Sequence, residues 1–533
     1  MEKIIIFAIS LIPFVMAQIK YPIGIQTFRD IITEDFIYVD KTALVYDITD
    51  RYRYVFLSRP RRFGKSLLVS TIESYFKGEK SLFNGLALES LERKWISYPV
   101  FRFDFSPANY VDESRLSESI YGSLKSIAQD YSLSLDRSGV SENFASLIKQ
   151  AYLKYGKKVV ILIDEYDKPL LDCLHDHDLN EKLKGELRGF YSVIKASDQY
   201  IRFAMLTGIS KFGKLSIFSG MNNLKDISLI PRYNDICGIS ESEFHRYFRA
   251  SIESFAEEHD ISEEKAWSEF RKKYDGYHFA SKGEGIYNPF SVINAFDDNE
   301  LDDYWFESGS PSYLIRLIEK NNYRLDAIDG QKRTKLELSD ITDTSTDFVP
   351  LLFQSGYLTI KGYNPDTSKY LLDFPNREVV TAFWSSLANH FLRGMDGQSA
   401  FNLKKCLKDI NEGRPEDFMT SMKSLFADTN SEREKDKEIH FQNMMAIAAK
   451  MMGLTVRTEI HSAKGRCDMQ ILTSGYVYIF EFKINDTPEE AIKQIHEKGY
   501  ALPFEADSRT IFLIGANFST NSRTLDGWII EML

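Results

Sequence analysis

Two groups of residues in this 533-residue sequence are of the types that carry out phosphate chemistry, and the first lies in the string RPRRFGKSLL, residues 59–68. The string follows a short apolar segment that predicts a strand and precedes an apolar stretch that predicts a helix. In that position a glycine lets backbone amides approach phosphate oxygens, a lysine neutralises the phosphates, and a serine hydroxyl binds magnesium. We therefore expect a nucleotide-binding loop whose contacting residues are Arg62, Phe63, Gly64, Lys65, Ser66 and Leu67.

The phosphate-binding loop departs from its usual pattern at one position. The pattern G-x-x-x-x-G-K-[ST] requires a glycine where this sequence has Arg59. The tripeptide Gly-Lys-Ser alone is weak support for a phosphate-binding loop. A basic turn before a helix is the competing interpretation. The flanking strand and helix favour a phosphate loop, and so does an acidic segment further along the chain.

The acidic segment is KKVVILIDEYDKP, in which an apolar strand over residues 159–163 delivers Asp164 and Glu165 at its carboxyl end. In phosphoryl-transfer sites an aspartate there holds the serine-bound magnesium, and the following glutamate polarises the attacking water. An ordinary strand that ends in an acidic turn is the competing interpretation. The next apolar strand ends at Thr207, whose hydroxyl could sense the terminal phosphate, whereas Lys211 is interpreted as a surface lysine.

The second group lies near the carboxyl terminus, in GRCDMQILTSGYVYIFEFK. Side chains alternate along a strand, so Glu481 and Lys483 point to the same face, and a hairpin places Asp468 on the neighbouring strand. The two carboxylates offer magnesium hard oxygen ligands, and the ammonium can orient the attacking water. The spacing D-x12-E-x-K fits the PD-(D/E)XK pattern of metal-dependent phosphodiester hydrolysis, although Cys467 replaces the proline.

A surface salt bridge on a β-hairpin is the competing interpretation of this trio. However, Glu481 and Lys483 alternate with bulky apolar residues on a strand that the pattern predicts to be half buried. Charges placed there are costly unless they are paired or metal-bound. The sequence therefore favours a magnesium-dependent nuclease site with Asp468, Glu481 and Lys483 as catalytic residues. In the helix that follows, Gln494 and Lys498 could contact a nucleic-acid backbone or the scissile phosphate.

Beyond these motifs, the chain from about residue 20 to residue 375 resembles the bacterial AAA-ATPase-like family. The resemblance is carried by RPRRFGKSLL, LIDEYDKPL, TGISKFGKLSIFSGMNNL and the opening PIGIQTFRDII…FIYVDKT. It implies a P-loop sheet in which the Thr207 strand lies between the phosphate-loop strand and the Asp164 strand. It also implies that Arg59 in place of the first glycine is a family trait, and that residues 40–42 lie toward the adenine.

The carboxyl-terminal block resembles the PD-(D/E)XK nuclease superfamily domain that is often fused to that same ATPase. The resemblance rests on the helix KEIHFQNMMAIAAKMMG, the GRCD strand, the FEFK strand and the helix after it. It implies an acidic metal ligand on the first helix, where Glu438 is the matching residue and Glu459 on the next strand is the alternative. The metal ligands expected for the two sites together are Ser66, Asp164, Glu438, Asp468 and Glu481.

Composition narrows the class of protein. Hydrophobic residues make up 43% of the chain, so a core can be buried, and the length suffices for roughly three to four domains. The net charge of −11 excludes binding of nucleic acid through a broad basic face, so such contact must be local. The four cysteines form no CxxC pair, which argues against a zinc ribbon or a disulfide framework and fits a reducing compartment.

The amino terminus is ambiguous. An apolar run over residues 4–17 is similar to a signal peptide and too short for a confident membrane span. The region before it is nearly neutral, Pro13 interrupts it, and Met16 offers an alternative start. We interpret residues 1–17 as a signal-like apolar leader or a mis-assigned start, and we expect a cytoplasmic protein without membrane association.

Strands that alternate with helices predict an α/β protein with a parallel sheet in its first half. A polar, densely charged stretch over residues 428–437 predicts a linker. The expected strands are residues 52–57, 100–105, 159–163, 201–206 and, more weakly, 226–230. The expected domains are an AAA-ATPase-like P-loop domain over residues 18–240, a helical or winged-helix-like middle region over 241–430, and an α/β restriction-endonuclease-like domain over 431–533.

Together these features favour an ATP-binding and ATP-hydrolysing protein with a nuclease-like domain that acts on nucleic acid, DNA in the first place, with ATP and Mg²⁺ as cofactors. The alternative is a nucleotide-dependent switch or binding protein whose carboxyl-terminal fold binds nucleic acid or a partner without cleavage. The chain could also form a homo-oligomer, since related ATPases often complete a site with a neighbour's arginine. No arginine of this sequence stands out for that role.

Overall fold

The structure is a computed structural model of the whole chain, which describes most residues from 19 onward. The apolar leader and most of the expected linker lie outside the described residues. Within them, no helix is both long enough and apolar enough to cross a membrane. The described residues are 19–173, 176–211, 223–307, 318, 325, 328, 330–339, 347–391, 403–427, 437–462, 465–522 and 524–533.

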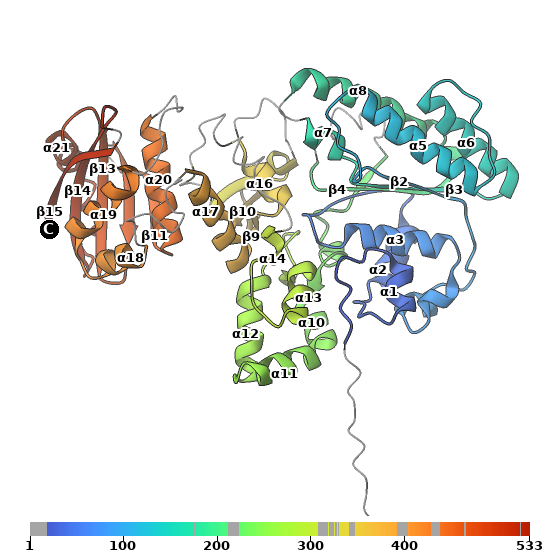
Figure 1. Cartoon of the computed structure of the whole chain (residues 1–533), viewed down its shortest axis with the longest axis horizontal. Coiled ribbons are helices and arrows are strands. Elements are labelled where there is room, and N and C mark those ends of the chain that lie inside the picture. Colours follow the sequence, from blue (N-terminus) through green and yellow to red (C-terminus); the bar gives the residue numbers. More distant parts are fainter. Residues whose placement is uncertain are drawn as a thin grey trace, which may run out of the picture.

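Five parallel strands form the sheet in the first half of the chain (Figure 1). They are β1 (Tyr54–Ser58), β2 (Val100–Asp104), β3 (Val159–Asp164), β4 (Ile201–Gly208) and β5 (Lys225–Asp226). Their order is β2-β3-β4-β1-β5, so β4 lies between β1 and β3, as the family resemblance implied. Leu57 pairs with Thr207, and Ile163 pairs with Leu206. Continuous apolar runs predicted β1 to β4, since strands covered on both faces are apolar throughout. The fifth strand, expected over residues 226–230, is the short edge strand Lys225–Asp226 instead.

Helices cover the two faces of this sheet, and β1 contributes side chains to both cores. Val55 and Leu57 lie in the core beneath α3 (Lys65–Phe76), whereas Phe56 lies in the core on the opposite face. That opposite face is covered by α5 (Ser114–Asp130), α6 (Val140–Tyr155) and α8 (His177–Ala196), as Figure 1 shows. In such a sheet the strands present their carboxyl ends, and the loops after them, at one edge.

The middle region is helical in its first part and contains a small sheet in its second part. Ser240 begins the first helix with a capping box that includes Glu243, and Asn288 caps the fourth helix just before Pro289. The helices are α10 (Glu241–Tyr247), α11 (Arg249–Glu258), α12 (Glu263–Tyr274) and α13 (Pro289–Asp297). The second part comprises β8 (Gln331–Thr334), α16 (Val349–Ser355), β9 (Thr359–Asn364), β10 (Lys369–Asp373) and α17 (Arg377–Phe391), with antiparallel strands in the order β8-β10-β9.

The carboxyl-terminal domain is built on a second five-stranded sheet, which is mixed. Its elements are α20 (Lys437–Met451), β11 (Thr455–Ser462), β12 (Gly465–Leu472), β13 (Tyr476–Ile484), α21 (Pro488–Lys498), β14 (Thr510–Ser519) and β15 (Thr524–Met532). The strands follow the order β11-β12-β13-β14-β15, and the β13–β14 pair is parallel whereas the other pairs are antiparallel. Helix α21 connects the parallel pair and lies so close to β14 that a side chain at Gly515 would meet the backbone of Pro488 and Ile492 at 2.7 Å.

Two helices before the expected linker also pack on this sheet. They are α18 (Leu403–Asn411) and α19 (Pro415–Ala427). The Tyr478 hydroxyl donates a hydrogen bond of 2.5 Å to the carbonyl of Ile410, and the Thr524 hydroxyl donates one of 3.0 Å to the carbonyl of Lys423. We therefore propose that the carboxyl-terminal domain begins near residue 403 and not at residue 431.

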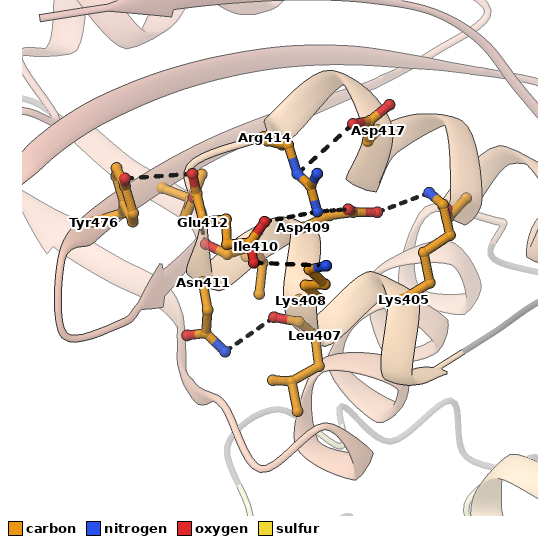
Figure 2. Close-up of polar contacts among 12 residues, drawn as sticks. Lys405, Leu407, Lys408, Asp409, Ile410, Asn411, Glu412, Arg414, Asp417 and Tyr476 are labelled. Atoms are coloured by element: carbon orange, nitrogen blue, oxygen red, sulfur yellow. Dashed lines mark hydrogen bonds and ion pairs between the residues drawn. The ribbon is translucent and has the colours of Figure 1, made fainter.

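The turn between α18 and α19 is closed around one buried carboxylate (Figure 2). Asp409 is 1% exposed and accepts hydrogen bonds from Arg414 at 2.6 Å and from Lys405 at 2.8 Å. The backbone amide of Arg414 also donates to the carbonyl of Asp409 at 2.9 Å. Asp417 meets the same arginine at 3.8 Å, but its side chain is 57% exposed.

A second buried carboxylate joins segments of the middle region. Glu378, near the start of α17, is fully buried and accepts hydrogen bonds from the Ser291 hydroxyl at 2.9 Å and the Trp305 backbone amide at 2.8 Å. Burial raises its pKa to about 8, and the two hydrogen bonds oppose this rise only in part. The Trp305 indole in turn donates to the carbonyl of Arg61 at 3.1 Å, in the phosphate loop.

Replacing the two aspartates that meet Arg414 should have unequal effects. We expect Asp409→Ala to lower the free energy of unfolding by about 1–3 kcal/mol, because it removes the buried acceptor that two charged donors share at this turn. Asp417→Ala should change it by less than about 0.5 kcal/mol, as exposed ion pairs contribute little. Chemical denaturation followed by circular dichroism measures both, and equal losses would contradict the closing role of Asp409.

The contribution of Glu378 to stability should depend on pH. Between its usual pKa of 4.5 and about 8, the folded chain holds a proton that the unfolded chain has released, so stability falls as pH rises. Glutamine in its place cannot ionise, so Glu378→Gln should gain stability relative to wild type between about pH 5 and pH 8. Urea unfolding of both proteins at these two pH values tests this, and a constant difference would contradict a neutral buried carboxyl group.

Candidate active sites

The phosphate loop runs from β1 into the amino terminus of α3. Gly64 directly precedes α3 and has a φ of +88°, a left-handed conformation that favours glycine. Arg62 is also left-handed, with a φ of +66°, and its guanidinium lies 4.8 Å from the ring centroid of Phe290. Free backbone amides and the helix dipole make such a helix start a binding site for anions.

Lys65 is held at the centre of the loop. Its side chain is 3% exposed, and its ammonium donates to the carbonyls of Arg59 and Pro60, both at 3.2 Å. The same ammonium lies 3.3 Å from a carboxylate oxygen of Glu165. The residues that the sequence placed in the loop and after β3 therefore meet in space.

The acidic pair lies at the carboxyl end of β3. Asp164 is 1% exposed, and one of its oxygens accepts a hydrogen bond of 2.5 Å from the Thr207 hydroxyl at the end of β4. The other oxygen, Oδ2, is buried and has no hydrogen-bond partner among the residues that the structure describes. Burial raises the pKa of Glu165, and the charge of Lys65 opposes that rise. An oxygen of this kind suits a cation such as magnesium, with the Ser66 hydroxyl on the nearby loop as a further ligand.

A cavity of about 560 Å³ opens over the phosphate loop. Its polar end contains Ser66, Lys65 and Glu165. Its remaining wall is largely apolar and comes from three parts of the chain: the amino-terminal strip before α2 (Thr42–Arg51), the stretch before α10, and α13 together with Phe248 between α10 and α11. These apolar residues include Ile25, Ile37, Val39, Ile236, Ile239, Phe248, Phe290 and Ile293, and the loop residues Arg62, Phe63, Gly64 and Leu67 also line the cavity.

Of the three residues expected near the adenine, Lys41 alone lines the cavity. Lys41 also forms an ion pair of 2.5 Å with Glu243. Asp40 instead accepts hydrogen bonds from the backbone amides of Thr42 and Ala87, both at 2.8 Å. Thr42 is fully buried, and its hydroxyl accepts from the backbone amide of Leu88 at 3.0 Å. The roles of these two side chains are thus structural, and the expectation was wrong for them.

Asp167 is a site residue that the sequence analysis missed. It is fully buried and accepts hydrogen bonds from the backbone amide and the hydroxyl of Ser210, both at 2.6 Å, and from the Ile209 amide at 3.3 Å. A side chain at Gly208 would approach its carboxylate to 2.4 Å. Asp167 therefore fixes the loop after Thr207 against the acidic pair, and the second aspartate of DEYD was its signal in the sequence.

Lys211 is not a surface lysine. Its side chain is 3% exposed and pairs with Asp226 of β5 at 3.0 Å. Its backbone amide donates a hydrogen bond of 2.5 Å to Gln354 of α16. Both partners lie far away in the sequence, which is why the local pattern gave no sign of burial.

The carboxyl-terminal trio comes together on β12 and β13. Met469 pairs with Phe480, which places Asp468 beside Glu481 across the two strands. The backbone amide of Phe482 donates to Asp468 at 2.7 Å, and the Lys483 ammonium donates to Glu481 at 3.3 Å. The side chains of Glu481 and Lys483 are 3% and 22% exposed, so a surface salt bridge does not describe this site.

Glu481 is the buried centre of this second site. Burial raises its pKa to about 7, the charge of Asp468 adds to the rise, and the charge of Lys483 opposes it. Its oxygen Oε1 accepts from Lys483 and from the side-chain amide of Gln494. Among the side chains that the structure describes, none donates a hydrogen bond to its buried oxygen Oε2, as is also the case for Asp164 Oδ2 in the first site.

Gln494 and Tyr500 complete the second site. The Gln494 carbonyl accepts from the Lys483 ammonium at 2.6 Å, and its amide donates to the Tyr500 hydroxyl at 3.3 Å. That hydroxyl donates to the carbonyl of Arg466 at 2.7 Å. Contact of Gln494 with a nucleic-acid backbone or the scissile phosphate stays a prediction, and the structure adds its hydrogen bond to Lys483. The local sequence gives no sign of a role for Tyr500, because its contact with β12 is formed only in the folded domain.

The third carboxylate of the metal site remains a prediction. Glu438 lies in α20 and Glu459 in β11, but their side chains fall outside the described residues. Among the side chains that the structure does describe, no three histidines, cysteines, aspartates or glutamates form a group able to hold a metal ion. Asp468 and Glu481 are therefore the described carboxylates from which a metal site could be built.

Comparison with known proteins assigns the two sites to two different domains. A family model described as a predicted AAA-ATPase matches residues 22–218, and one described as the PD-(D/E)XK nuclease superfamily matches residues 436–528. An uncharacterised protein from the vnfD 5′ region of Azotobacter chroococcum mcd 1 is 35% identical over 536 residues, which cover 97% of this chain and 100% of the relative.

Among solved structures, the ORC2 protein of Aeropyrum pernix, determined in ADPNP–ADP complexes, matches 65% of this chain and 94% of its own. The identity is 12% and the TM-score is 0.24, a similarity too low to bear on function. The full-length relative and the two family models are informative. The chain belongs to the same family as the Azotobacter protein, and it joins an AAA-ATPase-like domain to a carboxyl-terminal PD-(D/E)XK nuclease superfamily domain.

Proposed function

We propose that this protein binds and hydrolyses ATP at its first site and cleaves phosphodiester bonds of nucleic acid at its second, with magnesium at both. One observation carries the proposal. Within the described residues, each site holds a buried carboxylate oxygen to which no protein group donates, Asp164 Oδ2 or Glu481 Oε2. Each site also has a lysine paired with a glutamate, Lys65 with Glu165 and Lys483 with Glu481. A buried carboxylate oxygen without a partner is costly, and a bound cation would satisfy it.

In the first site, Ser66 and Asp164 would hold magnesium, which would neutralise charge on the phosphates. When ATP binds, the Lys65 ammonium would contact the phosphate oxygens in place of its ion pair with Glu165. Glu165 would then be free to accept a proton from the attacking water. Thr207, whose hydroxyl donates to Asp164, would sense the terminal phosphate through that contact.

In the second site, Asp468 and Glu481 would hold magnesium, which would stabilise negative charge on the scissile phosphate. Lys483 would orient the attacking water, with its ammonium aimed by Gln494. Tyr500 holds Gln494 in turn. We propose DNA as the first substrate to test, although the chemistry of the site is shared by RNA and DNA backbones.

Two substitutions separate nucleotide binding from hydrolysis. Lys65→Ala should abolish detectable ATP binding because it removes the cation at the phosphates. Glu165→Gln should bind ATP but lower the rate of hydrolysis about a hundredfold or more, since glutamine cannot accept the proton. Phosphate release and calorimetric titration measure the two effects, with the exposed Lys125→Ala as control. Full ATPase activity in Lys65→Ala would refute the assignment of the first site.

The nuclease half is tested by nicking of supercoiled plasmid in the presence of magnesium. Asp468→Ala and Glu481→Gln should each lower the nicking rate about a hundredfold or more, because each removes a metal ligand. The exposed Asp526→Ala in the same domain should nick like wild type. Wild-type protein that binds the plasmid without nicking it would favour the alternative, a nucleotide-dependent binding protein.

A further inference from the structure

Arg59 occupies the position of the first glycine in the phosphate loop, and its side chain is almost completely buried. The residue is 1% exposed. One guanidinium nitrogen donates to the carbonyls of Ser58 at 3.0 Å and Ser228 at 2.8 Å, and another donates to the carbonyl of Tyr233 at 2.8 Å. The guanidinium carbon also lies 4.2 Å from the ring centroid of Phe279. One side chain thus ties the end of β1 to the loop after β5 and to the middle region.

The main chain of Arg59 lies between two parts of the first site. Its amide donates to the carbonyl of Gly208 at 3.1 Å, directly after Thr207. Its carbonyl accepts from the Lys65 ammonium at 3.2 Å. A shift of Arg59 would therefore move both the lysine that meets the phosphates and the loop that follows the threonine.

The charge of Arg59 is not balanced by a close carboxylate. Across the described part of the chain, no carboxylate oxygen lies within 4.0 Å of its guanidinium, and its Nε atom has no hydrogen-bond partner. Burial lowers its pKa to about 10, so the group still carries its charge at neutral pH. Asp226 and Asp235 favour the charged form only from beyond 4.0 Å, so part of the cost of burial remains. A polyphosphate bound nearby would relieve that cost.

We infer that Arg59 is a positioning residue for the triphosphate: it fixes the start of the phosphate loop and supplies a second buried positive charge behind Lys65. The loop thereby keeps a defined shape where the usual glycine is absent. The inference rests on the proposed ATP site and adds a residue to it.

Calorimetric titration of the full chain with ATP, and separately with adenosine, tests the inference. Arg59→Met removes the charge and keeps much of the volume, so it should weaken ATP binding about tenfold or more while leaving adenosine binding within about twofold of wild type. Arg59→Lys keeps the charge and should bind ATP within about threefold of wild type. Arg115→Met, at a side chain that is 57% exposed, is the matched control and should bind both as wild type does.

Equal ATP affinity in Arg59→Met and wild type would overturn the inference, and so would equal losses for ATP and adenosine, which a purely structural role predicts. If Arg59→Met does not fold, Arg59→Gln replaces it, since glutamine retains hydrogen-bond donors without the charge. Equal ATP affinities of Arg59→Gln and Arg59→Lys would then overturn the inference, because the two variants differ in charge. Wild-type protein that binds no ATP would refute the proposed function itself, a result distinct from any of these.

Discussion

The cost of burying a carboxylate governs both candidate sites. A carboxylate that leaves water loses several kcal/mol of hydration unless hydrogen bonds, a cation or a proton replace it. Asp167 is satisfied by three hydrogen bonds, and Glu378 by a raised pKa together with its donors. Asp164 and Glu481 each retain a buried oxygen that meets no hydrogen-bond donor in the described part of the chain. Asp167 and Glu378 stabilise the fold around the sites. Asp164 and Glu481 are the carboxylates at which bound cations would replace the lost hydration.

The phosphate loop is held from outside its own sheet. The Trp305 indole donates to the carbonyl of Arg61, the Phe63 ring packs against Tyr277, and a side chain at Gly356 would approach Pro60 to 2.6 Å. The same middle region continues into α17, which packs against α20 of the carboxyl-terminal domain (Figure 1). The two sites are therefore joined by packed elements and not by a chain connection alone.

The sequence predicted the features that depend on local pattern. Continuous apolar runs predicted the four long strands of the first sheet, and the spacing of Asp468, Glu481 and Lys483 predicted a trio that the structure brings together. Features that depend on distant partners escaped it. Lys211 is buried because Asp226 and Gln354 meet it, and α18 and α19 join the carboxyl-terminal domain through contacts with strands more than fifty residues later.

The most direct test is a count of bound metal ions, made by titrating Mn²⁺ into the wild-type chain with and without a non-hydrolysable ATP analogue. The account predicts one site without nucleotide, lost in Glu481→Gln, and a second that forms with the analogue and is lost in Asp164→Asn. Mn²⁺ binding that neither substitution changes would contradict the claim that these two buried carboxylates hold metal.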